Sequence, residues 1–202
     1  MQRLAQPEVL KSASVAAIIT CVACFPRFTL WQMRSYPIWY LEAVLLLGSM
    51  VLWAFVFAWH TKYTGQPVFV RKTDARTRAL ATFAAILLAV VLHLFLYPGL
   101  RQRTPEDYPA SLEQWVAMTL FTLAFNQLFL VFAPFAWCVR LFQRKWWAAS
   151  LTVLFGVFVL VVKNQASTTP LPASLFVSLL MVRLVIGTIS VYLYLRGGVT
   201  LV

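Results

Sequence analysis

Charged side chains are scarce in this 202-residue sequence, and acidic ones are nearly absent. Only 11% of the residues are charged, only 6 of them are Asp or Glu, and 61% of the residues are hydrophobic. A water-soluble domain carries roughly 25% charged and 45–50% apolar residues, because polar groups must cover its surface. This composition excludes an ordinary soluble domain, and the lipid bilayer is the expected solvent.

Cysteine is also rare, and the familiar catalytic motifs are missing. Cys21, Cys24 and Cys138 are too few for a secreted disulfide scaffold. Cys21 and Cys24 form C-x-x-C on one helical face, where small residues serve close helix packing; redox chemistry is the minor alternative. The sequence has no serine nucleophile elbow, no phosphate-binding loop and no H-E-x-x-H helix. We therefore expect neither a metal nor a cofactor.

Basic residues greatly outnumber acidic ones, at 17 Lys and Arg for a net charge of +11. In a soluble protein this charge would suggest nucleic-acid binding. Here the bases stand mostly between apolar segments, where they meet lipid headgroups and set the orientation of the chain. We expect a lipid bilayer as partner and no nucleic acid.

Long apolar runs define the expected fold. Crossing about 30 Å of hydrocarbon takes about 20 helical residues. A shorter run, Ser12–Phe25, ends at Pro26 and spans only with local thinning or a continuation through "FTLWQM". We predict an all-α polytopic membrane protein of about six transmembrane helices, forming one domain over residues 1–202. The five longer runs are Pro37–Trp59, Ala79–Pro98, Leu112–Val139, Trp147–Val162 and Ala173–Leu195.

The loops predict the orientation, because cytoplasmic loops of membrane proteins are enriched in Lys and Arg. With the N-terminus inside, most basic residues fall on the inner side, and few on the outer side. We therefore expect a multi-pass protein of the bacterial inner membrane with both termini in the cytoplasm. The inner set is Arg3, Lys11, Lys62, Arg71, Lys72, Arg76, Arg78, Arg140, Arg144, Lys145 and Arg196, and the outer set is Arg27, Arg34, Arg101, Arg103 and Lys163.

A first group of polar residues inside the predicted spans is Glu42 and His93. Counted by helical rise, both lie about 8 Å from the outer edge. The structural interpretation is a hydrogen bond between neighbouring helices, worth about 1 kcal/mol. The alternatives are a proton relay, a metal site, or no contact at all.

A second group is Asn126, Gln127 and Arg183, each near the middle of its span. Arg183 lies about 15 Å below the outer edge, close to the depth of the two amides. Either amide can present a carbonyl oxygen to the guanidinium, which would satisfy it structurally. The alternative is a polar ligand-binding cavity at this level. Pro134, in the same span as the amides, predicts a kink.

The longest basic loop is "HTKYTGQPVFVRKTDARTR". We interpret it first as a topology anchor, and second as a docking site for a protein partner or an anionic lipid. Its basic residues in the predicted site are Lys62, Arg71, Lys72, Arg76 and Arg78.

From Leu112 onward, the order "FNQLFLVFAPF", "RKWWAASLTVLFGVFVLVVKNQ" and "LLMVRLVIGTISVYLYLRGG" resembles the CAAX protease and bacteriocin-processing family of intramembrane proteases. In that family a helix carries E-E-x-x-x-R, and a later helix carries a histidine. Placed on this pattern, the two glutamates fall at Asn126 and Gln127, the arginine at Val131, and the histidine near Val162 or Lys163. Because an amide cannot act as a general base, the resemblance implies a non-catalytic relative.

The function expected from the sequence is association. We expect a non-catalytic integral membrane protein, a scaffold, assembly factor or accessory subunit of a larger membrane complex, with other membrane subunits as partners. One alternative is an intramembrane hydrolase or proton-transfer enzyme that uses Glu42 and His93. Another is a small transporter or lipid-binding protein with a cavity near Arg183.

Overall fold

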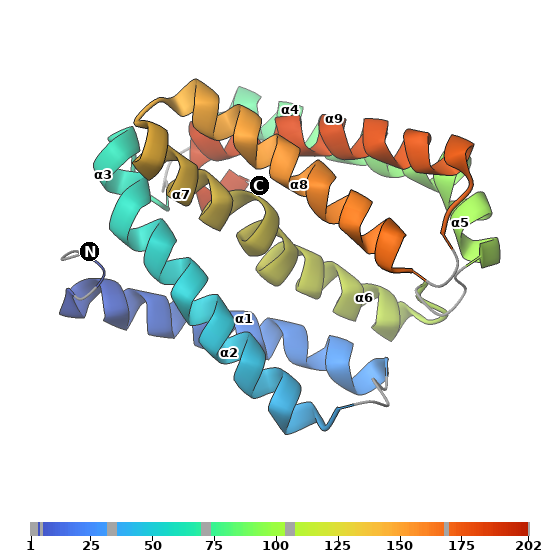
Figure 1. Cartoon of the computed structure of the whole chain (residues 1–202), viewed down its shortest axis with the longest axis horizontal. Coiled ribbons are helices and arrows are strands. Elements are labelled where there is room, and N and C mark those ends of the chain that lie inside the picture. Colours follow the sequence, from blue (N-terminus) through green and yellow to red (C-terminus); the bar gives the residue numbers. More distant parts are fainter. Residues whose placement is uncertain are drawn as a thin grey trace. The chain divides into compact units, whose positions relative to one another are not determined.

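The computed structural model describes Leu4 and residues 6–31, 36–69, 74–103, 108–167 and 170–201. Within this part the chain is helical throughout apart from turns and one isolated bridge (Figure 1). The elements are α1 (Pro7–Leu30), α2 (Ile38–Phe55), η1 (Val56–His60), α3 (Thr61–Thr64), α4 (Ala75–Val91), η2 (Leu92–Leu96), α5 (Tyr97–Arg103), α6 (Leu112–Phe121), η4 (Thr122–Asn126), η5 (Leu128–Phe132), α7 (Ala133–Phe142), α8 (Lys145–Ala166), α9 (Ala173–Gly197) and the 3-10 turn η6 (Val199–Leu201).

Among the described residues, six continuous helices are long and apolar enough to cross a membrane, which confirms the all-α multi-pass fold. The doubtful first helix is α1, whose 24 residues pass through Pro26 and extend about 36 Å, so no thinning of the bilayer is required. An even number of spans returns the chain to the side on which it started; which side that is stays a prediction. The spans are Pro7–Leu30, Ile38–Thr64, Ala75–Arg103, Leu112–Phe142, Lys145–Ala166 and Ala173–Gly197.

Several helices begin at a proline or at a polar capping residue. Pro7 occupies the first turn of α1, where its missing N–H has no intrahelical partner to lose. Pro37 and Pro172 cap α2 and α9 in extended conformations. At α6, the hydroxyl of Ser111 accepts a hydrogen bond of 3.2 Å from the N–H of Gln114.

π-helical segments precede two of the internal prolines, Pro98 and Pro134, whereas Pro26 lies within the regular helix α1. A proline ring collides with the carbonyl of the residue four positions earlier. For Pro134 that residue is Leu130, within η5, and for Pro98 it is Leu94, within η2. The wider π turn moves this carbonyl away from the ring. A π segment directly precedes Pro134, and the predicted kink there stays a prediction.

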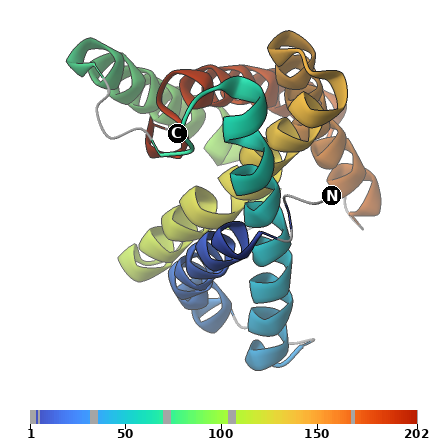
Figure 2. The same cartoon turned by 90° about the vertical axis from the view of Figure 1, so that its left-hand side faces the viewer.

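The helices group into two compact units by their contacts, and the prediction of a single domain stays a prediction. The first unit comprises Met1–Val68 and Pro109–Ala148. In it α1 crosses α2 and also packs against α6, which Figures 1 and 2 show from two sides. Cys24, Phe28 and Leu45 form a buried core between these helices.

The second unit comprises Phe69–Tyr108 and Ala149–Val202. Its α8 and α9 form an antiparallel pair: a Cβ at Gly187 of α9 would lie 3.4 Å from the side chain of Val153 of α8. The span that starts with α4 reaches α9 at its far end, where a Cβ at Gly99 would meet Leu175 at 3.1 Å. At the other end, Phe69 and Gly198 form an antiparallel bridge.

Candidate functional site

The two units divide the predicted site residues between them. Glu42, Asn126 and Gln127 belong to the first unit, whereas His93 and Arg183 belong to the second. The pairing of Glu42 with His93 and that of Arg183 with the amides therefore both stay predictions. What the structure does show is the surroundings of each residue within its own unit.

Arg183 lies against a glycine in the middle of the α8–α9 pair. A Cβ at Gly156 would lie 2.8 Å from both Nε and Nη2 of Arg183, so only a glycine lets the guanidinium take this place. Both residues stand ten positions from the helix ends that the hairpin joins, at a depth of about 15 Å. In a hydrocarbon layer about 30 Å thick, this depth corresponds to the middle.

The guanidinium of Arg183 meets no opposite charge among the described residues of its own unit. It makes no hydrogen bond or ion pair with the residues described there. Asp74 is the one carboxylate of this unit that the structure describes. It directly precedes α4, at the end of that span and not at its middle. A cation in hydrocarbon is costly without a counter-charge, so its presence indicates a purpose.

Asn126 and Gln127 occupy the junction of two π segments. Asn126 is the last residue of η4, and Gln127 separates η4 from η5. Both side chains are half-buried. No sequence signal predicted this double π segment beyond Pro134. Because π turns widen the helix, they alter the directions in which the two amides point relative to a regular helix.

Glu42 lies near the start of α2 beside α1. Its backbone carbonyl accepts a weak bond of 4.0 Å from Sγ of Cys21. Its carboxyl Oε1 is buried and has no hydrogen-bond partner among the described residues.

The two histidines have different surroundings. His93, in η2, is exposed on its unit, with its ring 5.8 Å from that of Tyr97 on the same span. His60 is fully buried, and its ring lies 6.2 Å from that of Phe135. Within the described residues, no group of three or more His, Cys, Asp or Glu side chains is placed to hold a metal ion.

The predicted basic loop is described only in part. Lys62 stands in α3, with its Nζ 5.0 Å from the ring centre of Tyr63. Arg76 and Arg78 lie in the first turn of α4 and are exposed. Arg71 and Lys72 lie outside the described residues.

Sequence reasoning missed two polar contacts that join neighbouring helices. Trp53 Nε1 donates a hydrogen bond of 3.0 Å to Oγ1 of Thr20, which in turn donates one of 2.9 Å to the carbonyl of Ala16. At the end of the same unit, Cζ of Arg140 lies 4.3 Å from the ring centre of Trp59. Trp53 stands away from the ends of its span, unlike the tryptophans of an aromatic belt, and this position was the available signal.

No family model, curated protein or solved structure matches the chain.

Proposed function

We propose that this protein is a non-catalytic membrane subunit that assembles with another membrane protein, and that Arg183 is the group through which it does so. The observation that carries the proposal is the guanidinium at mid-span, seated against Gly156 without a hydrogen bond or ion pair to the described residues of its own unit. We propose that a carboxylate on a transmembrane helix of the partner supplies the missing charge.

The energetics support a protein partner. A single charge at the centre of the bilayer costs at least about 2.5–3.5 kcal/mol on insertion scales. An Arg–carboxylate pair is bidentate and geometrically specific, and in hydrocarbon its rupture would leave two unpaired charges. Such a pair therefore holds two helices together in one register.

The amides at Asn126 and Gln127 support the non-catalytic part of the proposal. If the chain is a degenerate relative of the CAAX protease and bacteriocin-processing family, Asn126 and Gln127 replace its glutamates. Amides cannot remove a proton from water, so the reaction of that family would be lost.

Co-purification in mild detergent tests the proposal. Arg183→Ala should lose a partner that the wild-type protein retains. Arg196→Ala is the matched control: it removes the same charge from the last turn of α9, where Arg196 lies over the ring of Tyr192 at 5.4 Å. A wild-type protein that remains monomeric in every mild detergent would contradict the proposal.

Glu42 requires its own test, because it lies deeper in its span than the other acidic residues of the helices. Glu8 and Glu113 are each the second residue of theirs. If Glu42 neutralises Arg183 within the chain, Glu42→Gln should destabilise the protein as Arg183→Ala does. The exchanged double variant, Glu42→Arg with Arg183→Glu, should then restore folding. That result would replace the partner carboxylate by an internal pair.

The second candidate function is an intramembrane enzyme that uses Glu42 and His93. One observation favours it: the buried Oε1 of Glu42 has no hydrogen-bond partner among the described residues. If the protein is such an enzyme, Glu42→Gln should abolish a cellular phenotype while the protein stays folded and keeps its partners.

A further inference from the structure

A guanidinium held by two indole rings lies at one end of the first unit. Cζ of Arg140, in α7, is 4.3 Å from the ring centre of Trp59 and 5.8 Å from that of Trp137. The two indoles meet edge to face at 5.5 Å. Phe55 stacks on Trp59 at 4.7 Å with an interplanar angle of 16°. The aromatic rings thus fix the position of the cation.

The N–H groups of Arg140 are available as hydrogen-bond donors to a ligand. Stacking occupies the face of the guanidinium, whereas its five N–H groups point outward in its plane. Arg140 makes no ion pair with the described residues. These include Glu8, in the first turn of α1. A planar cation with unused in-plane donors matches the bidentate geometry of a phosphate.

The site lies at the end of its span, the level at which lipid phosphates are expected. Paired rings show that the spans containing α2 and α7 run in the same direction, since Trp53 faces Phe132 and Trp59 faces Trp137. Arg140 is two residues, or about 3 Å, from the end of its span. Two further cations, Arg144 and Lys145, follow at once and are exposed.

A tight turn keeps these charges together. Gln143 ends α7 in the left-handed conformation, with φ 53°, and its N–H donates a bond of 2.9 Å to the carbonyl of Val139. The chain therefore reverses within two residues and starts α8 at Lys145.

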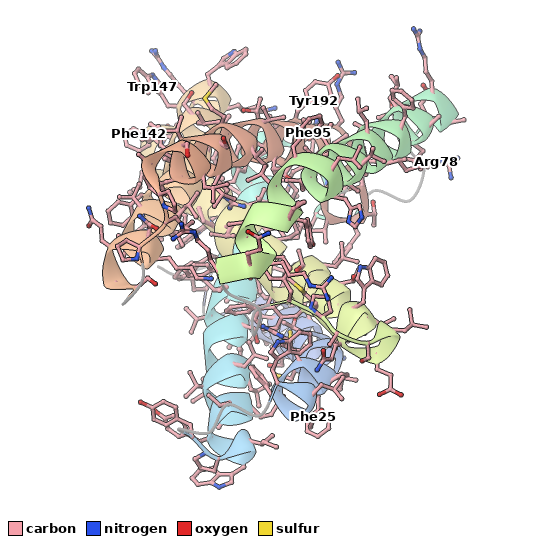
Figure 3. All side chains as sticks on the ribbon, turned by 90° about the vertical axis from the view of Figure 1, so that its right-hand side faces the viewer. Phe25, Arg78, Phe95, Phe142, Trp147 and Tyr192 are labelled. Carbon is pink, nitrogen blue, oxygen red and sulfur yellow. The ribbon has the colours of Figure 1, made fainter. Side chains whose placement is uncertain are left out.

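The surroundings favour a lipid over a soluble phosphate. Phe142, Trp146 and Trp147 flank the cations and are 48%, 86% and 57% exposed. Figure 3 shows Phe142 and Trp147 at the periphery of the ribbon where α7 gives way to α8. Exposed aromatic rings next to a cation gain contact with glycerol and acyl groups, which a soluble phosphate lacks.

We propose that Arg140, positioned by Trp59 and Trp137 and assisted by Arg144 and Lys145, binds the phosphate of an anionic phospholipid. This inference is independent of the partner proposed for Arg183, because the two groups lie in different units and need different ligands.

Native mass spectrometry of the full-length protein in detergent, titrated with phosphatidylglycerol or phosphatidylcholine, tests the site. Wild type should prefer phosphatidylglycerol. Arg140→Ala and Arg140→Gln should each weaken its binding about fivefold, the effect of one interfacial cation, and leave phosphatidylcholine unchanged. The glutamine variant keeps a planar group on Trp59, so it guards against a folding defect. Arg140→Lys should also lose affinity, because an ammonium cannot bind a phosphate bidentately.

Arg101→Ala is the matched control. It removes an exposed arginine from α5 that belongs neither to this site nor to the basic loop before α4. Equal losses in Arg101→Ala and Arg140→Ala would overturn the site, because they would show that binding depends on the net charge of the protein rather than on Arg140. Displacement of phosphatidylglycerol by millimolar glycerol phosphate would identify a soluble phosphate as the ligand. Capture of an acidic protein segment, abolished by Arg140→Gln while lipid binding stays unchanged, would also overturn the proposal.

Discussion

Gly156 and Arg183 meet at the middle of the α8–α9 pair, where the backbone of the glycine leaves room for Nε and Nη2 of the arginine. The sequence alone does not reveal that these two residues are in contact. Together they make a seat for one cation inside the hydrocarbon, and they provide the first prediction.

Gly156→Ala should move the guanidinium without unfolding the protein. The new Cβ would lie 2.8 Å from the end of a flexible side chain, which can swing aside, so we expect a loss of stability below about 1 kcal/mol. Association through Arg183 should nevertheless weaken, as measured by co-purification. In an Arg183→Ala background, Gly156→Ala should have no further effect, because the colliding group is gone.

Gly187→Ala is the control for Gly156→Ala. Its Cβ would meet Val153 at 3.4 Å, which is close to ordinary contact, and the three nearest atoms all belong to Val153. If both glycine variants weaken association equally, close helix packing rather than the position of Arg183 carries the effect.

Thr20→Val should destabilise the first unit by about 0.6–1.7 kcal/mol, the range measured for interhelical hydrogen bonds in membranes. The valine keeps the shape but removes the acceptor of Trp53 Nε1. Unfolding in a detergent titration measures the change. Thr29→Val should stay within about 0.5 kcal/mol, because the Thr29 hydroxyl bonds only to carbonyls of its own helix. Equal effects of the two variants would contradict a special role for the Thr20–Trp53 bond.

Gln143→Gly should stabilise the protein by roughly 0.5–1 kcal/mol. Gln143 has a φ of 53°, a conformation that glycine adopts without the steric cost of a Cβ. Thermal unfolding monitored by circular dichroism measures the gain. The same residue introduced at Ala79, within α4, should instead cost about 1 kcal/mol. A loss at both positions would show that the left-handed turn is not strained.

Pro134→Ala should convert η5 into regular α-helix, because the ring that displaces the carbonyl of Leu130 is removed. Residues before the bulge then rotate relative to α7, and the contact between Phe132 and Trp53 at 6.3 Å is lost. We expect a destabilisation of about 1–3 kcal/mol despite better local hydrogen bonding. Amide hydrogen exchange across residues 128–134 measures the change.

Pro7→Ala is the matched control for Pro134→Ala. Pro7 stands in the first turn of α1, where its ring faces no preceding carbonyl of the helix. Its replacement should leave exchange and stability nearly unchanged. Slower exchange at residues 128–134 without loss of stability in Pro134→Ala would show that the packing of Phe132 does not need the π segment.

Several features were predictable because they depend on neighbouring residues only. The number of spans follows from apolar runs, and the depth of Arg183 follows from counting residues along its helix. The ends of the helices were less predictable: Lys145 and Ala166 extend α8 past its apolar run, and helical hydrogen bonding continues into the interface where polar side chains are tolerated.

The contacts of the polar residues were not predictable in the same way. Counting residues along each helix places Glu42 and His93 at the same depth. It does not reveal which helices are neighbours or which face of each helix is turned inward. The sequence singled out neither Trp53 nor Arg140, although both have partners in a neighbouring helix of the first unit.

The amino-acid sequence by itself determined the solvent, the helical class and the number of crossings, because hydropathy and helical rise act along the chain. Only the tertiary structure decided that Thr20 accepts from Trp53, that Gly156 makes room for Arg183, and that Arg140 stacks on Trp59. Each of these contacts joins residues far apart in the chain. They depend on the rotation of one helix against another, which in lipid is set by side-chain packing and polar pairing rather than by hydrophobicity.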